Sequence, residues 1–250
     1  MTSIHTQFNE IIDHIDQLAR HSYVEQTLGK PPVPVFFVRI LYLLMRSCGV
    51  SDERIRVYCT AATLLQMGLD THDLVSLEPV QSAEEKRRRQ LHVLIGDYYS
   101  SLFYVILSKH REIDGIQCLA KATSTINETK MTHHREQMKA GWNLNVHALK
   151  RMQVISGGLL TALADFFHVG NQPENVWQKI IPGFILFDLL KRYSSILHPD
   201  GELGKWVEHT WNELNQAIPE IEQTDVREEL TEILNRQLPY LNGFSRVKER

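Results

Sequence analysis

The chain has 250 residues, 43% of them hydrophobic, and a formal net charge of -3 at pH 7. This length suits one large domain over residues 1–250, and the slightly acidic balance excludes binding to nucleic acid through overall positive charge. Three widely spaced cysteines, Cys48, Cys59 and Cys118, predict reduced core thiols rather than a disulfide framework or a zinc site.

The sequence gives no sign of a targeting or membrane segment. The first 21 residues hold no apolar run of signal-peptide length. Elsewhere, no segment approaches the roughly 20 apolar residues that a membrane span needs. We therefore expect a cytoplasmic protein with no transmembrane segment.

The first half of the chain shows helical spacing of its apolar residues and no strand-like alternation. Helices are predicted around residues 8–18 and 36–44, on either side of a proline-rich break. Ser51 is a candidate N-cap for a further helix, which ends near Asp70 and Asp73. A capping-box pattern at residues 82–85 then opens a long helix that runs to about residue 106.

The second half repeats the helical pattern. The predicted elements are a helix from about Ile113, a helix over Val146–Phe167, a helix from Pro173 to Ile196, a turn at 198–201, and amphipathic helices over Trp206–Ile218 and Val226–Leu238, the last entered through Thr224 and Asp225. The total of nine or ten helices predicts an all-α, single-domain bundle.

Two features of the central helices go beyond core packing. Gly96 lies inside the long helix, where glycine costs about 1 kcal/mol, so we expect another helix to approach closely at that point. The cations Arg87, Arg88 and Arg89 follow Lys86 in the first turns of the same helix, where the helix dipole disfavours positive charge. They form either a solvated face or a patch that contacts an acidic partner or a diphosphate.

Residues 69–75 and 90–98 together resemble the all-trans polyprenyl diphosphate synthases. That family carries a His-Asp-Asp-x-x-Asp helix followed by a helix that ends Leu-Ala-Gly-Asp, and this chain has His72-Asp73 and Gly96-Asp97. The C-terminal helices are similar as well, so the resemblance covers nearly the whole chain. It implies the helical isoprenoid-synthase fold and chemistry in which magnesium ions neutralise a departing diphosphate.

The chain departs from the family at its ligand positions. If Asp73 takes the first aspartate position, Leu74 and Leu77 take the other two. In the segment 183–191, which resembles the second metal-binding helix, Leu190 and Lys191 take the aspartate positions. A lysine there would repel a magnesium ion.

Other family contacts are also reduced. Residues 157–164 lack the family's diphosphate-binding lysine, and Lys30 alone remains from an isopentenyl diphosphate-binding segment. We therefore expect no catalytic, cofactor-binding or metal-binding residue in this chain. The remnants of the motifs are Asp70, His72, Asp73, Asp97 and Asp188.

Residues 68–75 and 89–98 resemble, more specifically, the small non-catalytic first components of two-component heptaprenyl diphosphate synthases. The resemblance implies a heterodimer with a catalytic component II, which holds Mg²⁺ at its active site. Together the two would condense isopentenyl diphosphate with farnesyl diphosphate to make the precursor of the menaquinone side chain. Hexaprenyl and heptaprenyl products are both compatible with these features.

A partner role has a physical basis if the partner's elongation tunnel ends at the subunit interface. Each added isoprene unit needs apolar space, so residues at the far end of the tunnel limit the product length. The candidate interface or tunnel-end residues are Leu94, Tyr98, Tyr99, Leu102 and Phe103. Burial in this chain's own core would explain the same residues equally well.

Two other functions compete with this interpretation. His72-Asp73 in a helical chain could belong to an HD-type metal phosphohydrolase, but no suitably placed upstream histidine accompanies it; the nearest, His21, lies beyond the proline-rich break. The chain could also be a helical adapter unrelated to isoprenoids. Metal analysis would identify the first, and co-purification with a prenyl synthase would exclude the second.

Overall fold

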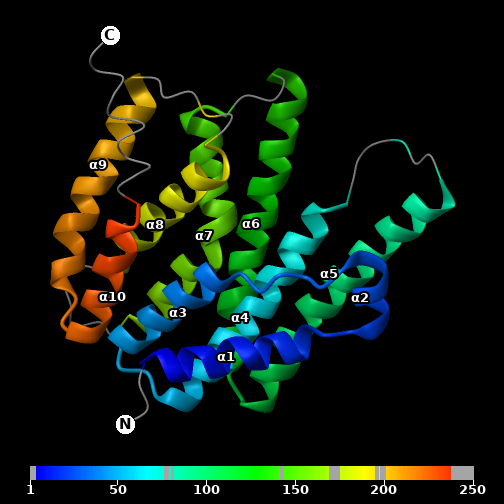
Figure 1. Ribbon diagram of the computed structural model, residues 1–250, viewed down its shortest axis with the longest axis horizontal. Helices are drawn as coiled ribbons and strands as arrows, with labels where there is room; N and C mark the ends of the chain where they lie inside the picture. The colour runs from blue at the N-terminus through cyan, green and yellow to red at the C-terminus, as the bar shows by residue number, and fades with distance from the viewer. Residues whose placement is uncertain are drawn as a thin grey trace. The chain divides into compact units, whose positions relative to one another are not determined.

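A computed structural model of the chain describes residues 4–75, 79, 82–140, 144–168, 175–194, 197 and 201–237. Over these residues it contains ten α-helices, one short 3-10 helix and no strand (Figure 1). The predicted all-α class and the predicted number of helices are confirmed.

The contacts within the chain divide it into two compact units. Unit 1 comprises Met1–Arg46 and Val50–Gln117, and unit 2 comprises Ser47–Gly49 and Cys118–Arg250. The boundary near residue 117 falls inside a continuous helix. The single domain expected from the sequence stays a prediction.

Unit 1 is organised around its fourth helix. Its helices are α1 (Ile4–Ala19), α2 (Ser22–Leu28), α3 (Val35–Ser47, whose last residue belongs to unit 2), α4 (Asp52–Asp73) and α5 (Ala83–Lys109). Helix α4 packs against α1 and α5, and most of its residues are buried. A helix that is buried on nearly all sides is the core element of its unit. It brings Asp70 and Asp73 to its C-terminal end, as expected.

Unit 2 contains most of α6 (Ile113–Ala140), followed by α7 (Val146–Phe167), α8 (Trp177–Arg192), α9 (Gly201–Ala217), a 3-10 turn (Ile218–Glu220) and α10 (Thr224–Asn235). Helix α8 packs against α7 and α9. Its middle is buried on most sides, including Phe184 and Phe187.

Several predicted helix ends are wrong by a turn or more. The helix expected from Pro173 to Ile196 begins at Trp177 and ends at Arg192, while Pro173, Ile196 and the turn residues 198–200 lie outside the described residues. Helix α9 begins at Gly201, before the expected Trp206, because its first turn is polar and carries little apolar signal. Leu238, the predicted end of α10, lies outside the described residues.

The capping prediction is confirmed in full at α5 and in position only at α4, and it is wrong at α10. Ser82 Oγ accepts a hydrogen bond from the Glu85 amide at 3.1 Å, and Glu85 Oε2 accepts one from the Ser82 amide at 3.1 Å, which completes the capping box of α5. Ser51 is the N-cap of α4, but its side chain makes no capping hydrogen bond. The N-cap of α10 is Gln223 and not the expected Thr224-Asp225 pair.

The three cysteines are free thiols, and the predicted core position is confirmed for Cys59 only. Cys59 is buried, and burial raises the pKa of its thiol. Cys48 and Cys118 are half-buried.

Candidate functional site

The two motif-bearing helices, α4 and α5, cross at close range in unit 1 (Figure 1). Two glycines make this approach possible. A Cβ atom on Gly96 would lie 2.6 Å from His72 Cε1, and a Cβ atom on Gly68 would lie 2.2 Å from Ser100 Oγ and 2.8 Å from the Gly96 carbonyl oxygen. The close approach expected at Gly96 is therefore confirmed, and the approaching helix is α4 of the same chain.

The histidine and the aspartate of the two motifs contact each other. His72 Nε2 lies 3.3 Å from Asp97 Oδ1, so the pair forms an ion pair whenever the imidazole is protonated. His72 also packs its ring on Gly96. Both motif residues thus join α4 to α5 within this chain, and this contact gives His72 a structural role that needs no metal.

The two aspartates at the end of α4 are exposed. Asp70 Oδ1 accepts a hydrogen bond from Gln66 Nε2 at 2.8 Å, one turn earlier in the helix. Asp73 is the last residue of α4, and the C-cap that follows it is Leu74, an exposed leucine. Leu77 lies outside the described residues. At this helix end, a leucine follows Asp73 where the family has its second aspartate.

The segment that resembles the second metal-binding helix lies in α8. Asp188 Oδ2 is 2.5 Å from Arg192 Nη2, so this carboxylate is paired within its own helix. Leu190 is buried and Lys191 is exposed at the two positions where the family has aspartates.

These residues do not fit a pair of magnesium ions. Magnesium in proteins requires oxygen ligands, and the ligand positions hold Leu74, Leu190 and Lys191. Among the described residues, no three histidine, cysteine, aspartate or glutamate side chains gather closely enough to hold a metal ion. That this chain works without its own metal or cofactor stays a prediction.

The basic run lies at the exposed start of α5. Lys86, Arg87 and Arg88 are exposed and Arg89 is half-buried. Within the described part of the chain, the first three take part in no ion pair. They are therefore accessible to an anionic group, and their proposed contact with a diphosphate or a partner stays a prediction.

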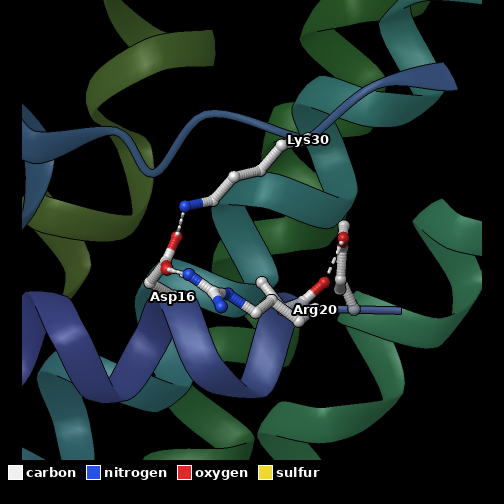
Figure 2. Close-up of polar contacts among 5 residues, drawn as sticks. Asp16, Arg20 and Lys30 are labelled. Atoms are coloured by element: carbon white, nitrogen blue, oxygen red, sulfur yellow. Dashed lines mark hydrogen bonds and ion pairs between the residues drawn. The ribbon is translucent and has the colours of Figure 1, made fainter. Parts of the chain in front are cut away.

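Lys30, the remnant of the isopentenyl diphosphate segment, already has an anionic partner. Figure 2 shows Asp16 of α1 between Lys30 and Arg20. Lys30 Nζ lies 2.6 Å from Asp16 Oδ1, and Arg20 Nη2 lies 2.9 Å from Asp16 Oδ2. The hydrogen bond from Lys30 is the main reason that the pKa of the Asp16 carboxyl is lowered. This carboxylate holds the connection between α2 and α3 against α1.

The candidate interface residues of α5 separate into two faces. Tyr99 and Phe103 are 1% and 2% exposed and belong to the core of unit 1, where Tyr99 Oη donates a hydrogen bond to the Ala19 carbonyl oxygen at 2.8 Å. Leu94 and Tyr98 are 63% and 42% exposed, and Leu102 is half-buried. In this chain, only the outer residues are accessible to a partner.

The sequence reasoning missed Val105, which is 60% exposed and follows Tyr98 by seven residues. Leu94, Tyr98 and Val105 are spaced by four and seven residues and therefore form one stripe along the helix. Val93 and Tyr104 widen it. We call these five residues the outer face of α5. The heptad spacing is the signal that could have identified it.

Among the described residues, α5 is also the one helix whose length and apolar composition would allow it to cross a membrane. This corrects the expectation that no segment comes close to that limit. A third of its apolar stretch is buried within the protein. A core helix of a water-soluble protein passes the same test, so the finding is weak evidence for a span.

Comparisons with known proteins show the family of the chain. A family model described as heptaprenyl diphosphate synthase subunit 1 matches residues 21–238. The chain is also 35% identical over 105 residues to the heptaprenyl diphosphate synthase component 1 of Geobacillus stearothermophilus. That alignment covers 42% of this chain and 44% of the relative, so it spans less than half of either. Because the family model covers most of the sequence, the chain belongs to the heptaprenyl diphosphate synthase subunit 1 family.

Proposed function

We propose that this chain is the non-catalytic subunit of a two-component heptaprenyl diphosphate synthase and pairs with a catalytic component II. The partner holds the magnesium ions and carries out the condensation of isopentenyl diphosphate with farnesyl diphosphate. The product is the precursor of the menaquinone side chain. Family membership supports this proposal, and so do the leucines and the lysine at the ligand positions.

The observation that carries the pairing is the outer face of α5. Exposed apolar residues are normal when scattered, but a contiguous row of them marks an interaction surface. Leu94, Tyr98 and Val105 make such a row on one side of a helix whose other side fills the core. A helix face of this kind is typical of packing against a second helix.

The same face offers a means of setting the product length. If the partner's elongation tunnel opens towards this interface, Leu94, Tyr98 and the half-buried Leu102 limit the apolar space at its end. Tyr99 and Phe103 influence it only through the position of α5, because their side chains are buried in unit 1. Hexaprenyl and heptaprenyl products differ by one isoprene unit, so a single side-chain change at this end is expected to shift the length.

We also propose that the assembly is cytoplasmic. Helix α5 contributes a third of its apolar stretch to this chain's own core and its outer face to the partner. Asp97 lies on the exposed side near the middle of the helix, where a charge in a bilayer would be costly.

The test compares three samples: this chain alone, a candidate component II alone, and the mixture. Each is incubated with labelled isopentenyl diphosphate, farnesyl diphosphate and magnesium, and the products are separated by length. Only the mixture should make long prenyl chains. Long product from this chain alone would overturn the proposal.

A variant pair tests the surface. Leu94→Asp places a charge on the outer face and should abolish co-elution with component II and long-chain synthesis. Met131→Asp is a matched control, since Met131 on α6 is 65% exposed and lies outside that face. Equal effects of the two substitutions, with both variants folded by circular dichroism, would exclude the outer face as the interface.

A further inference from the structure

We propose that unit 1 carries a second apolar binding site, which holds the hydrocarbon part of a neutral isoprenoid and not a diphosphate. The site is a groove between the connection after α2, the end of α4 and the first half of α5. The choice of an isoprenoid as the ligand depends on the proposed function. The groove and its charge do not.

The groove has a volume of about 280 Å³. Small-molecule sites typically measure ~300–1,000 Å³, so this one suits a small ligand. Its walls are mainly apolar and are formed by Val24, Leu28, Gly29, Pro31, Pro32, Met67, Leu74 and Ile95. Polar side chains contribute at four places, which are Lys30, Asp70, Thr71 and His92.

One wall of the groove has a conformationally restricted backbone. Pro31 and Pro32 have restricted backbone angles, and Gly29 takes a positive φ of 84° that favours glycine. The Thr71 hydroxyl donates to the Met67 carbonyl oxygen at 2.6 Å and is therefore used within α4. Because its donor is used, this hydroxyl adds little polar character to the wall.

The polar groups disfavour an anionic head. The charge of Lys30 is compensated by Asp16 at 2.6 Å. Asp70 adds a carboxylate to the lining. Burial, assisted by nearby Arg88, lowers the pKa of His92, so its imidazole is neutral at pH 7. Among the residues that line the groove, a diphosphate would meet a carboxylate and a compensated lysine, whereas a neutral ligand meets no repulsion; Arg88 lies near His92 but is not part of the lining.

The volume sets the length of the hydrocarbon. About 280 Å³ lies at the small end of the range of small-molecule sites, so a short isoprenoid chain is expected to fit. Geraniol, a ten-carbon alcohol, is therefore a suitable probe, and geranyl diphosphate is its matched anionic counterpart.

The experiment uses the full chain without component II and labels its methionine methyl groups with ¹³C. Met67 lines the groove and is assigned by Met67→Leu. Geraniol should produce a saturable shift of the Met67 signal, and geranyl diphosphate should bind at least tenfold more weakly. No saturable shift with either probe, or tighter binding of the diphosphate, would overturn the proposal.

Variants distinguish this site from the proposed interface. Leu74 in the groove and Leu94 on the outer face of α5 are both 63% exposed, so Leu74→Arg and Leu94→Arg are matched substitutions. Leu74→Arg should weaken geraniol binding at least fivefold and leave pairing with component II intact. Leu94→Arg should abolish pairing with component II and leave geraniol binding intact. Loss of geraniol binding in both variants would contradict the assignment.

A third variant tests the role of charge. Asp70→Asn removes the carboxylate from the groove, so it should raise the affinity for geranyl diphosphate severalfold and leave the affinity for geraniol unchanged. If the ratio of the affinities for geraniol and geranyl diphosphate stayed the same, Asp70 would not be the residue that selects against the diphosphate. If geraniol binds as expected and component II still fails to pair, only the proposed function fails.

Discussion

Gly68 and Gly96 occupy the same helix crossing, yet we expect alanine to have different effects at the two positions. At Gly68, a new Cβ atom would meet the backbone of α5, at 2.8 Å from the Gly96 carbonyl oxygen and 2.9 Å from the Ser100 nitrogen. At Gly96, its nearest neighbours are atoms of the His72 ring, at 2.6 to 2.8 Å. A backbone cannot move aside without separating the helices, whereas a half-exposed side chain can rotate.

The expected magnitudes follow from two opposing contributions. Replacing a mid-helix glycine by alanine stabilises a helix by about 1 kcal/mol. Overpacking a tight contact costs about 1–3 kcal/mol. For Gly68→Ala we take the upper value, so the free energy of unfolding should fall by about 2 kcal/mol, which corresponds to a Tm lower by ~4–8 °C. For Gly96→Ala the contributions nearly cancel, because only the exposed pair between His72 and Asp97 is lost.

The assay is urea unfolding followed by circular dichroism, with Tm as a second measure. His72→Ala provides the control, because it clears the space at Gly96 and leaves the contacts of Gly68 in place. Adding Gly96→Ala to His72→Ala should raise stability by up to about 1 kcal/mol. Adding Gly68→Ala to His72→Ala should still lower the free energy of unfolding. Wild-type stability of Gly68→Ala would refute the close-crossing explanation.

Three further predictions concern the core of unit 1 and its surface. Glu112 is held by Arg54 through contacts of 2.6 and 2.8 Å, and these lower the pKa of the carboxyl below its ordinary 4.5. Its stabilisation is therefore complete above pH 4.5 and is lost as the pH falls through the lower pKa, so the stability gap between wild type and Glu112→Gln should close in acid. Tyr99→Phe removes the hydrogen bond to Ala19 and should lower Tm by ~2–4 °C in thermal unfolding, for a loss of about 1 kcal/mol. Thr63→Val should leave Tm unchanged or raise it, because the buried Thr63 hydroxyl has no hydrogen-bond partner in the described part of the chain; a clear fall in Tm would point to a partner there.

Helical periodicity predicted the elements well because most helices of this chain bury one face, whereas α4 and α8 are buried on most sides. The capping box at Ser82 and Glu85 was predictable from four residues, since both of its hydrogen bonds are local. The start of α9 at Gly201 was not, because its first turn is polar and its apolar spacing begins later. The sequence predicts a helix end accurately only where the capping hydrogen bonds join residues that are close together in the sequence.

The candidate site shows the limit of the same reasoning. The local sequence of an apolar, aromatic helix does not indicate which residues face inward. The sequence therefore predicts Tyr98 and Tyr99 as one group, although Tyr98 is exposed and Tyr99 is buried. The separation depends on α4, which packs on one side of α5. Likewise, the contact between His72 and Asp97 joins residues that are 25 positions apart, and no spacing rule predicts it.

The ion pair between Asp16 and Lys30 bears on any attempt to restore catalysis to this chain. Substituting aspartates at positions 74, 77, 190 and 191 would recreate the acidic ligands, but Lys30 would still be paired with a carboxylate of α1. A phosphate would have to compete with Asp16 for that ammonium group, and success would leave Asp16 with Arg20 as its remaining partner. The redesign would therefore have to begin with a neutral residue at position 16, far from either metal-binding motif in the sequence.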